Sequence, residues 1–168
     1  MIEIESTSLE QTLAVGRAVA QVADAGDVIS LKGELGAGKT QFVRGMATGL
    51  GIDPQDVSSP TFVIMHEYDC DEAAGRGVQT LVHMDAYRLV GPDDLATVGW
   101  MDQGQEIRDS AVVAVEWGGL IREAMGPDVL EVTLSYHGDG RWIVLSPCGR
   151  WCDKMDQLES QLAPLHAL

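Results

Sequence analysis

An eight-residue segment with regularly placed glycines constrains the fold of this chain more than any other feature. Residues 33–40 are Gly-Glu-Leu-Gly-Ala-Gly-Lys-Thr, which fits the pattern Gly-x-x-x-x-Gly-Lys-[Ser/Thr]. In this pattern the glycines let successive backbone N–H groups converge on phosphate oxygens. Lys39 neutralises their charge and the Thr40 hydroxyl can ligate Mg²⁺. The segment therefore predicts a P-loop that binds a nucleoside triphosphate.

The residues on either side of the segment support this prediction. Residues 27–31 form a short apolar run that is typical of a buried strand, and apolar residues recur at helical spacing from Phe42 to Leu50. Gly51 is suited to close that helix in a left-handed conformation. A helix that begins at the loop directs its unbonded N–H groups and the positive end of its dipole at the phosphates. The alternative, a glycine-rich turn that holds nothing, does not account for this strand and helix.

Strand and helix patterns fill the rest of the chain. Segments with strand character lie at 61–65, 78–84, 111–115, 130–136 and 142–145. Helix signals occur at 7–26, from 91–95 onward and at 152–163. The strands at 61–65 and 78–84 are expected to be antiparallel neighbours, and those at 130–136 and 142–145 to form a hairpin. We predict an α/β P-loop NTPase fold with a central, mostly parallel sheet flanked by helices and antiparallel hairpin strands, as a single domain over 1–168.

The overall charge limits the possible partners. The chain has 26 acidic and 11 basic side chains, a formal net charge of -15. A surface of this sign repels a phosphate backbone, so no direct tRNA or other nucleic-acid binding is expected. Docking on a basic protein fits the same imbalance, and so does a charge kept for solubility.

Apolar patterning and the cysteines give further expectations. The chain has no apolar stretch long enough for a membrane span and begins with alternating acids, which predicts a soluble, cytoplasmic protein with no membrane association. Its three cysteines are Cys70, Cys148 and Cys152, an odd number without a CxxC pair. We expect reduced structural thiols rather than disulfides or a zinc site.

Two acids are candidates for the metal and water chemistry that nucleotide hydrolysis requires. Glu116 ends the apolar run 111–115, and Asp85 follows the apolar run 81–84. A carboxylate at the end of a buried strand beside the P-loop strand can complete the coordination of Mg²⁺. We favour Glu116 as the magnesium partner and Asp85 as the group that orients water or the metal's outer ligands. The alternative is that each acid caps the helix after it.

Three further residues near these motifs have two interpretations each. Thr61 follows a proline turn, where a mobile loop can bring its hydroxyl to the γ-phosphate and metal; an ordinary turn threonine is the alternative. His83 is expected to pack or form a hydrogen bond within its strand rather than to transfer protons, because phosphoryl chemistry rests on positioning and charge stabilisation. Trp117 either covers the site or lies in the core.

Four motifs together carry a resemblance to a known family. They are the P-loop at 33–40, Ser-Pro-Thr-Phe at 59–62, His-Met-Asp-Ala-Tyr-Arg-Leu at 83–89 and Val-Glu-Trp at 115–117. In order and spacing they resemble the TsaE family, also called YjeE, the small bacterial P-loop ATPases of tRNA threonylcarbamoyladenosine biosynthesis. The resemblance covers residues 5–145.

The resemblance implies an ATP- and Mg²⁺-dependent ATPase that is weak alone and works with the proteins TsaB and TsaD. It implies that these partners, and not this chain, hold the tRNA and transfer the threonylcarbamoyl group to adenosine 37. It implies that Lys39 binds phosphates, that Thr40 and Glu116 serve the metal, and that Thr61, Asp85 and Trp117 belong to the catalytic neighbourhood. The nucleotide-binding residues it implies are Glu34, Leu35, Gly36, Ala37, Gly38, Lys39, Thr40, Gln41, Trp117 and, near the base, Arg141, Thr7 and Ser8.

Two residues depart from the usual pattern of this family. Gln41 stands where many relatives have a second threonine, and Lys32 is a charged residue just before the loop that either forms a local salt bridge or faces solvent.

A small-molecule kinase is the alternative function, although it needs several arginines over the transferred phosphate. The Asn-Lys-x-Asp motif of GTPases and the Leu-Ser-Gly-Gly-Gln motif of transporter ATPases are absent. An assembly factor with incidental hydrolysis is a third class.

Overall fold

The computed structural model describes residues 1–60, 65–71, 76–89, 94 and 109–167. Thr61 and most of the helix start expected at 91–95 lie outside these residues. Within them, one sheet has the strand order β1-β7-β6-β2-β5-β4-β3. The strands are β1 (Ile2–Ser6), β2 (Val28–Lys32), β3 (Met65–Asp69), β4 (Thr80–Asp85), β5 (Ala111–Glu116), β6 (Val129–His137) and β7 (Gly140–Pro147). The helices are α1 (Leu9–Val22), α2 (Lys39–Gly49), α4 (Met155–Leu162) and the 3-10 helices η3 (Gly118–Met125), η4 (Gly149–Lys154) and η5 (Ala163–Ala167).

The centre of the sheet is parallel and its two sides are antiparallel. β2 lies between β5 and β6 and is parallel to both, and β4 is parallel to β5. β3 pairs antiparallel with β4, and β7 pairs antiparallel with β6 and β1. All six residues of β5 are buried, which is why its sequence is a continuous apolar run rather than an alternating one. The predicted α/β fold, with a mostly parallel sheet and antiparallel hairpin strands, is confirmed.

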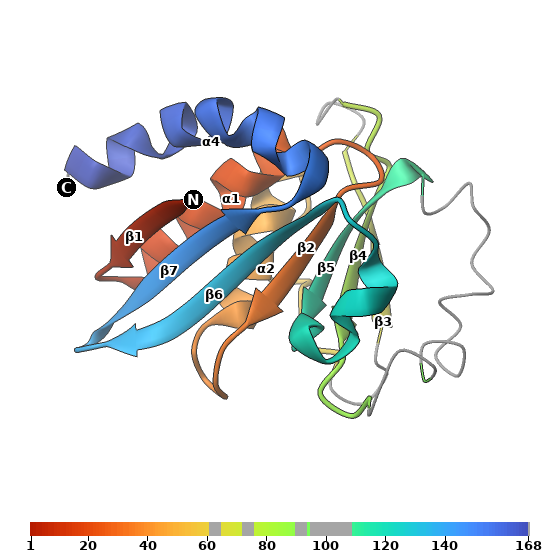
Figure 1. Ribbon diagram of the computed structural model, residues 1–168, viewed down its shortest axis with the longest axis horizontal. Helices are drawn as coiled ribbons and strands as arrows, with labels where there is room; N and C mark the ends of the chain where they lie inside the picture. The colour runs from red at the N-terminus through yellow and green to blue at the C-terminus, as the bar shows by residue number, and fades with distance from the viewer. Residues whose placement is uncertain (61–64, 72–75, 90–93, 95–108, 168) are drawn as a thin grey trace.

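Helices cover both faces of this sheet. Figure 1 shows α1 and α2 side by side on one face and η3 on the other. Two glycines let the backbones of α1 and α2 touch: a Cβ atom added at Gly16 would lie 2.1 Å from the Phe42 carbonyl oxygen, and one at Gly45 would lie 2.1 Å from the Leu13 carbonyl oxygen. This contact fixes α2, and with it the loop that precedes it, against the body of the protein.

Several local predictions differ from the structure. The first strand, β1, was not expected; its residues alternate between buried and exposed, and its acids, Glu3 and Glu5, face outward. The first helix begins as expected, since the Ser8 side chain accepts from the Gln11 N–H, but it ends at Val22 rather than near Gly26. The last helical region begins at 149 as the 3-10 helix η4 before α4. None of the described helices is both long and apolar enough to cross a lipid bilayer.

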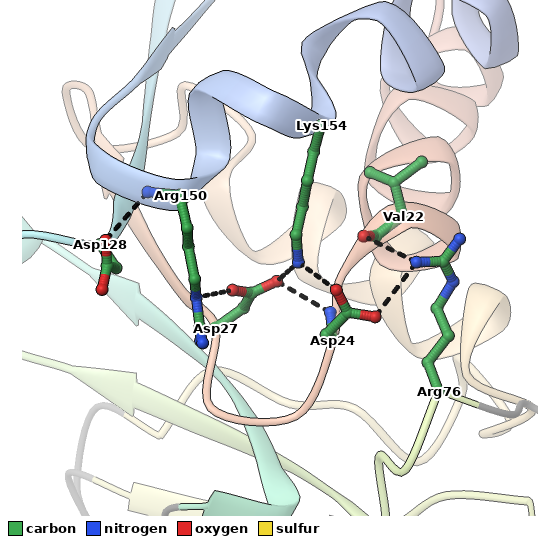
Figure 2. Close-up of polar contacts among 7 residues, drawn as sticks. All are labelled: Val22, Asp24, Asp27, Arg76, Asp128, Arg150 and Lys154. Atoms are coloured by element: carbon green, nitrogen blue, oxygen red, sulfur yellow. Dashed lines mark hydrogen bonds and ion pairs between the residues drawn. The ribbon is translucent and has the colours of Figure 1, made fainter.

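A group of charged residues attaches the C-terminal helices to the turn between α1 and β2 (Figure 2). The buried Asp27 carboxylate pairs with Arg150, whose Nε lies 2.8 Å from Oδ1, and with Lys154. Lys154 also lies 2.6 Å from Asp24, which pairs with Arg76 at 3.1 Å. Burial works against ionisation of Asp24, but Lys154 and Arg76 outweigh it and hold the pKa of Asp24 below its usual value. This cluster lies at the end of the sheet opposite the P-loop (Figure 1).

Candidate functional site

The carboxyl ends of β2, β4 and β5 place three motifs at one edge of the sheet. The P-loop follows β2, and Asp85 and Glu116 are the last residues of β4 and β5. These two acids are opposite each other in the register, and Glu116 is also opposite Leu31 of β2. In open α/β sheets ligands bind outside the carboxyl ends of the parallel strands. The edge formed here therefore has the position expected of a binding site.

The P-loop has the backbone of an anion cradle. Gly36 and Gly38 have φ values of +76° and +105°, a region that L side chains rarely adopt, and α2 begins at Lys39. The Lys39 ammonium donates to the carbonyl oxygens of Gly33 at 2.8 Å and Glu34 at 2.9 Å. Burial lowers the pKa of Lys39, whereas the nearby carboxylates of Glu116 and Asp85 favour its charged form. A cation beside the N-terminus of a helix favours a polyanion at this position.

Thr40 and Glu116 lie in direct contact. The Thr40 hydroxyl donates to Oε1 of Glu116 at 2.7 Å, and Nε2 of His83 lies 2.9 Å from the same oxygen. Because the carboxylate oxygen accepts, His83 presents its Nε2–H here, and its hydrogen bond goes to the neighbouring strand β5 rather than staying within its own strand. His83 is fully buried and Glu116 is 4% exposed. A hydroxyl and a buried carboxylate are the hard oxygen ligands that Mg²⁺ prefers, so these residues fit the predicted metal.

Asp85 provides a second buried carboxylate with a different environment. Its Oδ1 accepts from the backbone N–H of Tyr87 at 2.9 Å. Burial raises the pKa of Asp85 and the Glu116 carboxylate adds to this, whereas the Tyr87 N–H, His83 and Lys39 oppose it; the net direction is upward. Two buried acids at neighbouring strand ends, both interacting with the Lys39 cation, are typical of a functional site.

Two adjoining pockets surround these groups. The larger has a volume of about 430 Å³ and is lined by Leu35, Gly36, Gly38, Lys39, Thr40, Gln41, Ser59, Asp85, Tyr87, Glu116 and Trp117. The smaller has a volume of about 190 Å³ and is lined by Ser6, Ser8, Leu9, Thr12, Gly36, Gly38, Gln41, Asp139, Gly140 and Arg141. Both pockets include Gly36, Gly38 and Gln41, so they adjoin each other where the P-loop ends and α2 begins.

Some of the other predicted residues line one of the two pockets and others do not. Trp117 lines the larger pocket: its ring centroid is 3.9 Å from Nζ of Lys39 and 5.1 Å from the Tyr87 ring. Ser8 lines the smaller pocket, whereas Thr7 binds Gln11 through its N–H at 2.6 Å and its hydroxyl at 3.0 Å and is not among the lining residues. Thr61 lies outside the described residues. The ligand-binding roles assigned to all of these residues stay predictions.

Two residues of the β6–β7 hairpin contact the P-loop in a way that sequence reasoning missed. The Tyr136 hydroxyl donates to the Leu35 carbonyl oxygen at 3.0 Å. Arg141, expected near the base, donates from Nε to the Ala37 carbonyl oxygen at 3.0 Å and from Nη2 to that of Gly36 at 3.2 Å. Alternation along the hairpin indicates that both residues can share one face, but it does not say what they face.

Lys32, the charged residue just before the P-loop, forms a local salt bridge. Its ammonium lies 2.6 Å from Oε2 of Glu131, and the other oxygen of Glu131 lies 2.8 Å from Nε of Arg122 in η3. Lys32 lowers the pKa of Glu131, burial opposes this and Arg122 adds to the lowering. This answers the question that the sequence left open, and it ties η3 to β2 and β6.

The geometry of the site defines a class of protein, and similarity to known proteins defines the family. A buried parallel strand, a P-loop, a helix and carboxylates at the ends of neighbouring strands characterise a P-loop fold of the α/β class. The family model described as "Threonylcarbamoyl adenosine biosynthesis protein TsaE" matches residues 6–143. The chain therefore belongs to the TsaE family, as its motifs predict.

Individual relatives agree with this assignment. The chain is 39% identical over 130 residues to the tRNA threonylcarbamoyladenosine biosynthesis protein TsaE of Bacillus subtilis, covering 77% of this chain and 75% of that protein. It is 35% identical over 136 residues to the Treponema pallidum protein of the same name, covering 80% and 92%. The crystal structure of Bacillus subtilis YdiB superposes with a TM-score of 0.68 at 31% identity, covering 98% of this chain and 95% of that one.

Proposed function

We propose that this protein binds ATP with Mg²⁺ and hydrolyses it as a component of the machinery that forms N6-threonylcarbamoyladenosine at position 37 of tRNA, together with TsaB and TsaD. The observation that carries the ATPase part is the 2.7 Å contact between Thr40, in the first turn of α2, and Glu116, the last residue of the parallel strand β5. Membership of the TsaE family supports the place in tRNA modification.

The P-loop and Lys39 are proposed to hold the phosphates. Backbone N–H groups at the loop and at the start of α2 donate to the phosphate oxygens, and the ammonium exchanges its contacts with the Gly33 and Glu34 carbonyl oxygens for contacts with the anion. The flat face of Trp117, 3.9 Å from Nζ, keeps the ammonium in place and shields it from water. Most of the binding energy for the triphosphate is therefore expected from this loop.

Thr40 and Glu116 are proposed to hold Mg²⁺, directly or through water. When bound there, the ion offsets the negative charge that builds up on the β- and γ-phosphate oxygens during hydrolysis. His83 donates to Glu116 and so keeps its carboxylate turned toward Thr40. This outer hydrogen bond fixes the orientation of the proposed metal ligand.

Asp85 is proposed to orient the water that attacks the γ-phosphorus. The water oxygen forms the new bond to phosphorus as the bond from phosphorus to the β–γ bridging oxygen breaks, which gives ADP and phosphate. The raised pKa of Asp85 suits an acceptor for the proton that the attacking water gives up. Thr61 stays our proposal for a hydroxyl near the γ-phosphate.

The net charge supports a division of labour between this chain and its proposed partners. A net charge of -15 gives the protein a surface that repels tRNA, so the tRNA is expected to be held by TsaB and TsaD. ATP binding and hydrolysis would then act on the partner complex between its turnovers. The kinase alternative has less support, because the described lining of the two pockets includes one arginine, Arg141, and its guanidinium contacts the P-loop.

Phosphate release from ATP and Mg²⁺, with and without a TsaB–TsaD pair, tests this proposal. We expect partner-stimulated release by the wild type, loss of ATP binding in Lys39→Ala, and a fall in rate of roughly 100-fold or more with retained ATP binding in Glu116→Gln. Glutamine keeps the size of the side chain and removes only the charge. Equal rates for all three proteins would contradict the ATPase, and a labelled product formed from a small-molecule acceptor would favour the kinase.

A further inference from the structure

The β6–β7 hairpin contacts the P-loop through two residues that face each other across the strands. Tyr136 and Arg141 are partners in the antiparallel register of β6 and β7. The Arg141 guanidinium carbon lies 4.3 Å from the centroid of the Tyr136 ring, so the cation rests on the aromatic face. Both side chains bind main-chain oxygens of the P-loop. We call Tyr136 and Arg141 the hairpin clasp.

The hairpin clasp holds three consecutive carbonyl groups. Tyr136 binds the Leu35 oxygen, and Arg141 binds the oxygens of Gly36 and Ala37 with two nitrogens of its planar group. A third nitrogen of Arg141, Nη1, donates to the Gly140 oxygen at 2.8 Å, which fixes the guanidinium to its own hairpin. The clasp therefore joins a rigid antiparallel hairpin to the most glycine-rich part of the loop.

Fixing a carbonyl oxygen also fixes the N–H group of the next residue. The peptide unit is planar, and its C=O and N–H point in opposite directions. The oxygens of residues 35, 36 and 37 share peptide units with the N–H groups of Gly36, Ala37 and Gly38. Of these, Ala37 N–H donates to the Glu34 oxygen inside the loop at 3.2 Å. The clasp thus sets the direction of N–H groups that a P-loop offers to phosphate.

The loop needs such a constraint because its own residues restrict it little. Gly36 and Gly38 have no Cβ atom and adopt positive φ, so neither residue confines the backbone sterically. A Cβ atom added at Gly36 would lie 2.7 Å from the Tyr136 hydroxyl oxygen, so the tyrosine lies directly over this glycine. Ordering a flexible loop only when the ligand binds costs affinity, and prior ordering removes that cost.

We propose that Tyr136 and Arg141 are positioning residues that hold the P-loop in the conformation that binds a polyphosphate, and that Arg141 acts through the loop rather than by contacting the base. This inference rests on the proposed function, since it assumes that ATP is the ligand of the P-loop. It differs from the sequence-based expectation, which places Arg141 near the base.

Binding of two ligands separates these roles. Titration calorimetry with Mg²⁺ measures the Kd of ATP and of inorganic tripolyphosphate, which has the phosphates but no base. We expect Tyr136→Phe to weaken binding of both ligands by about 3- to 10-fold, because it removes one neutral hydrogen bond. We expect Arg141→Lys to weaken both by about 10- to 100-fold, because lysine keeps the charge but lacks the planar group that binds the Gly36 and Ala37 oxygens together. Arg150→Lys, at the opposite end of the sheet, is the matched control and should change neither Kd.

Amide hydrogen exchange supplies a readout that a general loss of stability would not give. In both clasp variants the amides of 36–38 should exchange faster, while those of β5 and α1 keep the protection of the wild type. Loss of ATP affinity with unchanged tripolyphosphate affinity would show that Arg141 contacts the base, and would overturn the inference. So would unchanged affinity for both ligands. Failure of the wild type to bind either ligand would instead contradict the proposed function itself.

Discussion

Replacing Asp27 with Asn should destabilise the protein although the change is far from the P-loop. The Asp27 side chain is fully buried, with one oxygen beside Arg150 and the other shared by Lys154 and the backbone N–H of Asp24. Asparagine has the same shape and keeps an acceptor for that N–H. The substitution therefore removes the negative charge and little else, and it leaves two cations facing a neutral group.

The size of the effect follows from how well each cation is buried. Breaking a buried ion pair by neutralising one partner costs about 3–5 kcal/mol. Two features reduce that figure here: Arg150 is 42% exposed and meets Asp27 without hydrogen-bond geometry, and Lys154 keeps Asp24 at 2.6 Å. We expect a loss of about 2–3 kcal/mol for Asp27→Asn, which lowers Tm by about 5–10 °C in a domain of this size.

Asp24→Asn is the matched control. Asp24 is 44% exposed, and each of its two exposed ion pairs contributes at most about 1 kcal/mol, so this variant should lose less than Asp27→Asn. Urea unfolding followed by circular dichroism measures both losses, and ATP titration should give the wild-type Kd for both variants. An equal or larger loss for Asp24→Asn, or a change of less than about 0.5 kcal/mol for Asp27→Asn, would refute the argument from burial.

Two further substitutions, one between α1 and α2 and one in the site, have effects that the geometry also determines. Gly45→Ala should lower Tm, because a Cβ atom at this position would lie 2.1 Å from the Leu13 oxygen and force α1 and α2 apart. The cost of about 1–3 kcal/mol outweighs the roughly 1 kcal/mol gained in helix propensity. Calorimetry measures Tm, and an unchanged value would contradict the close contact. Asp85→Asn should abolish ATP hydrolysis and raise Tm at neutral pH. Because the folded-state pKa of Asp85 is raised, its ionisation costs stability as pH rises, so the difference in Tm from the wild type should close as pH falls toward about 4; a difference independent of pH would contradict this.

The sequence predicts the centre of this fold well because local signals there agree with one another. The P-loop pattern, the apolar runs that become β2 and β5, and the helical spacing from Phe42 to Leu50 each require few distant contacts to interpret. Carboxyl ends of parallel strands share one edge, so Glu116 and Asp85 are expected near Thr40, and the structure brings them there. The binding and catalytic roles of these residues stay predictions.

The edges of the fold are harder to predict because their signals are not local. β1 is short, and its alternation of Ile2 and Ile4 with acids resembles a charged terminus until its partner β7, more than a hundred residues later, is known. The hairpin clasp poses the same problem. Tyr136 and Arg141 have the alternation of an ordinary hairpin, and only the packing of the sheet shows that they face the P-loop.

The pairing of the two acids depends on strand length and register rather than on either motif alone. β4 and β5 are both six residues long and are aligned from Thr80 opposite Ala111, so both end on an acid at the same level. Side chains alternate along a strand, so His83 lies on the same face as Asp85, two residues later, and reaches Glu116 on the neighbouring strand. Removing one residue from β5 would turn its remaining side chains to the opposite face and separate Glu116 from both His83 and Thr40. The motifs that contain Asp85 and Glu116 therefore form one site only because the apolar runs that precede these acids in β4 and β5 have matching lengths.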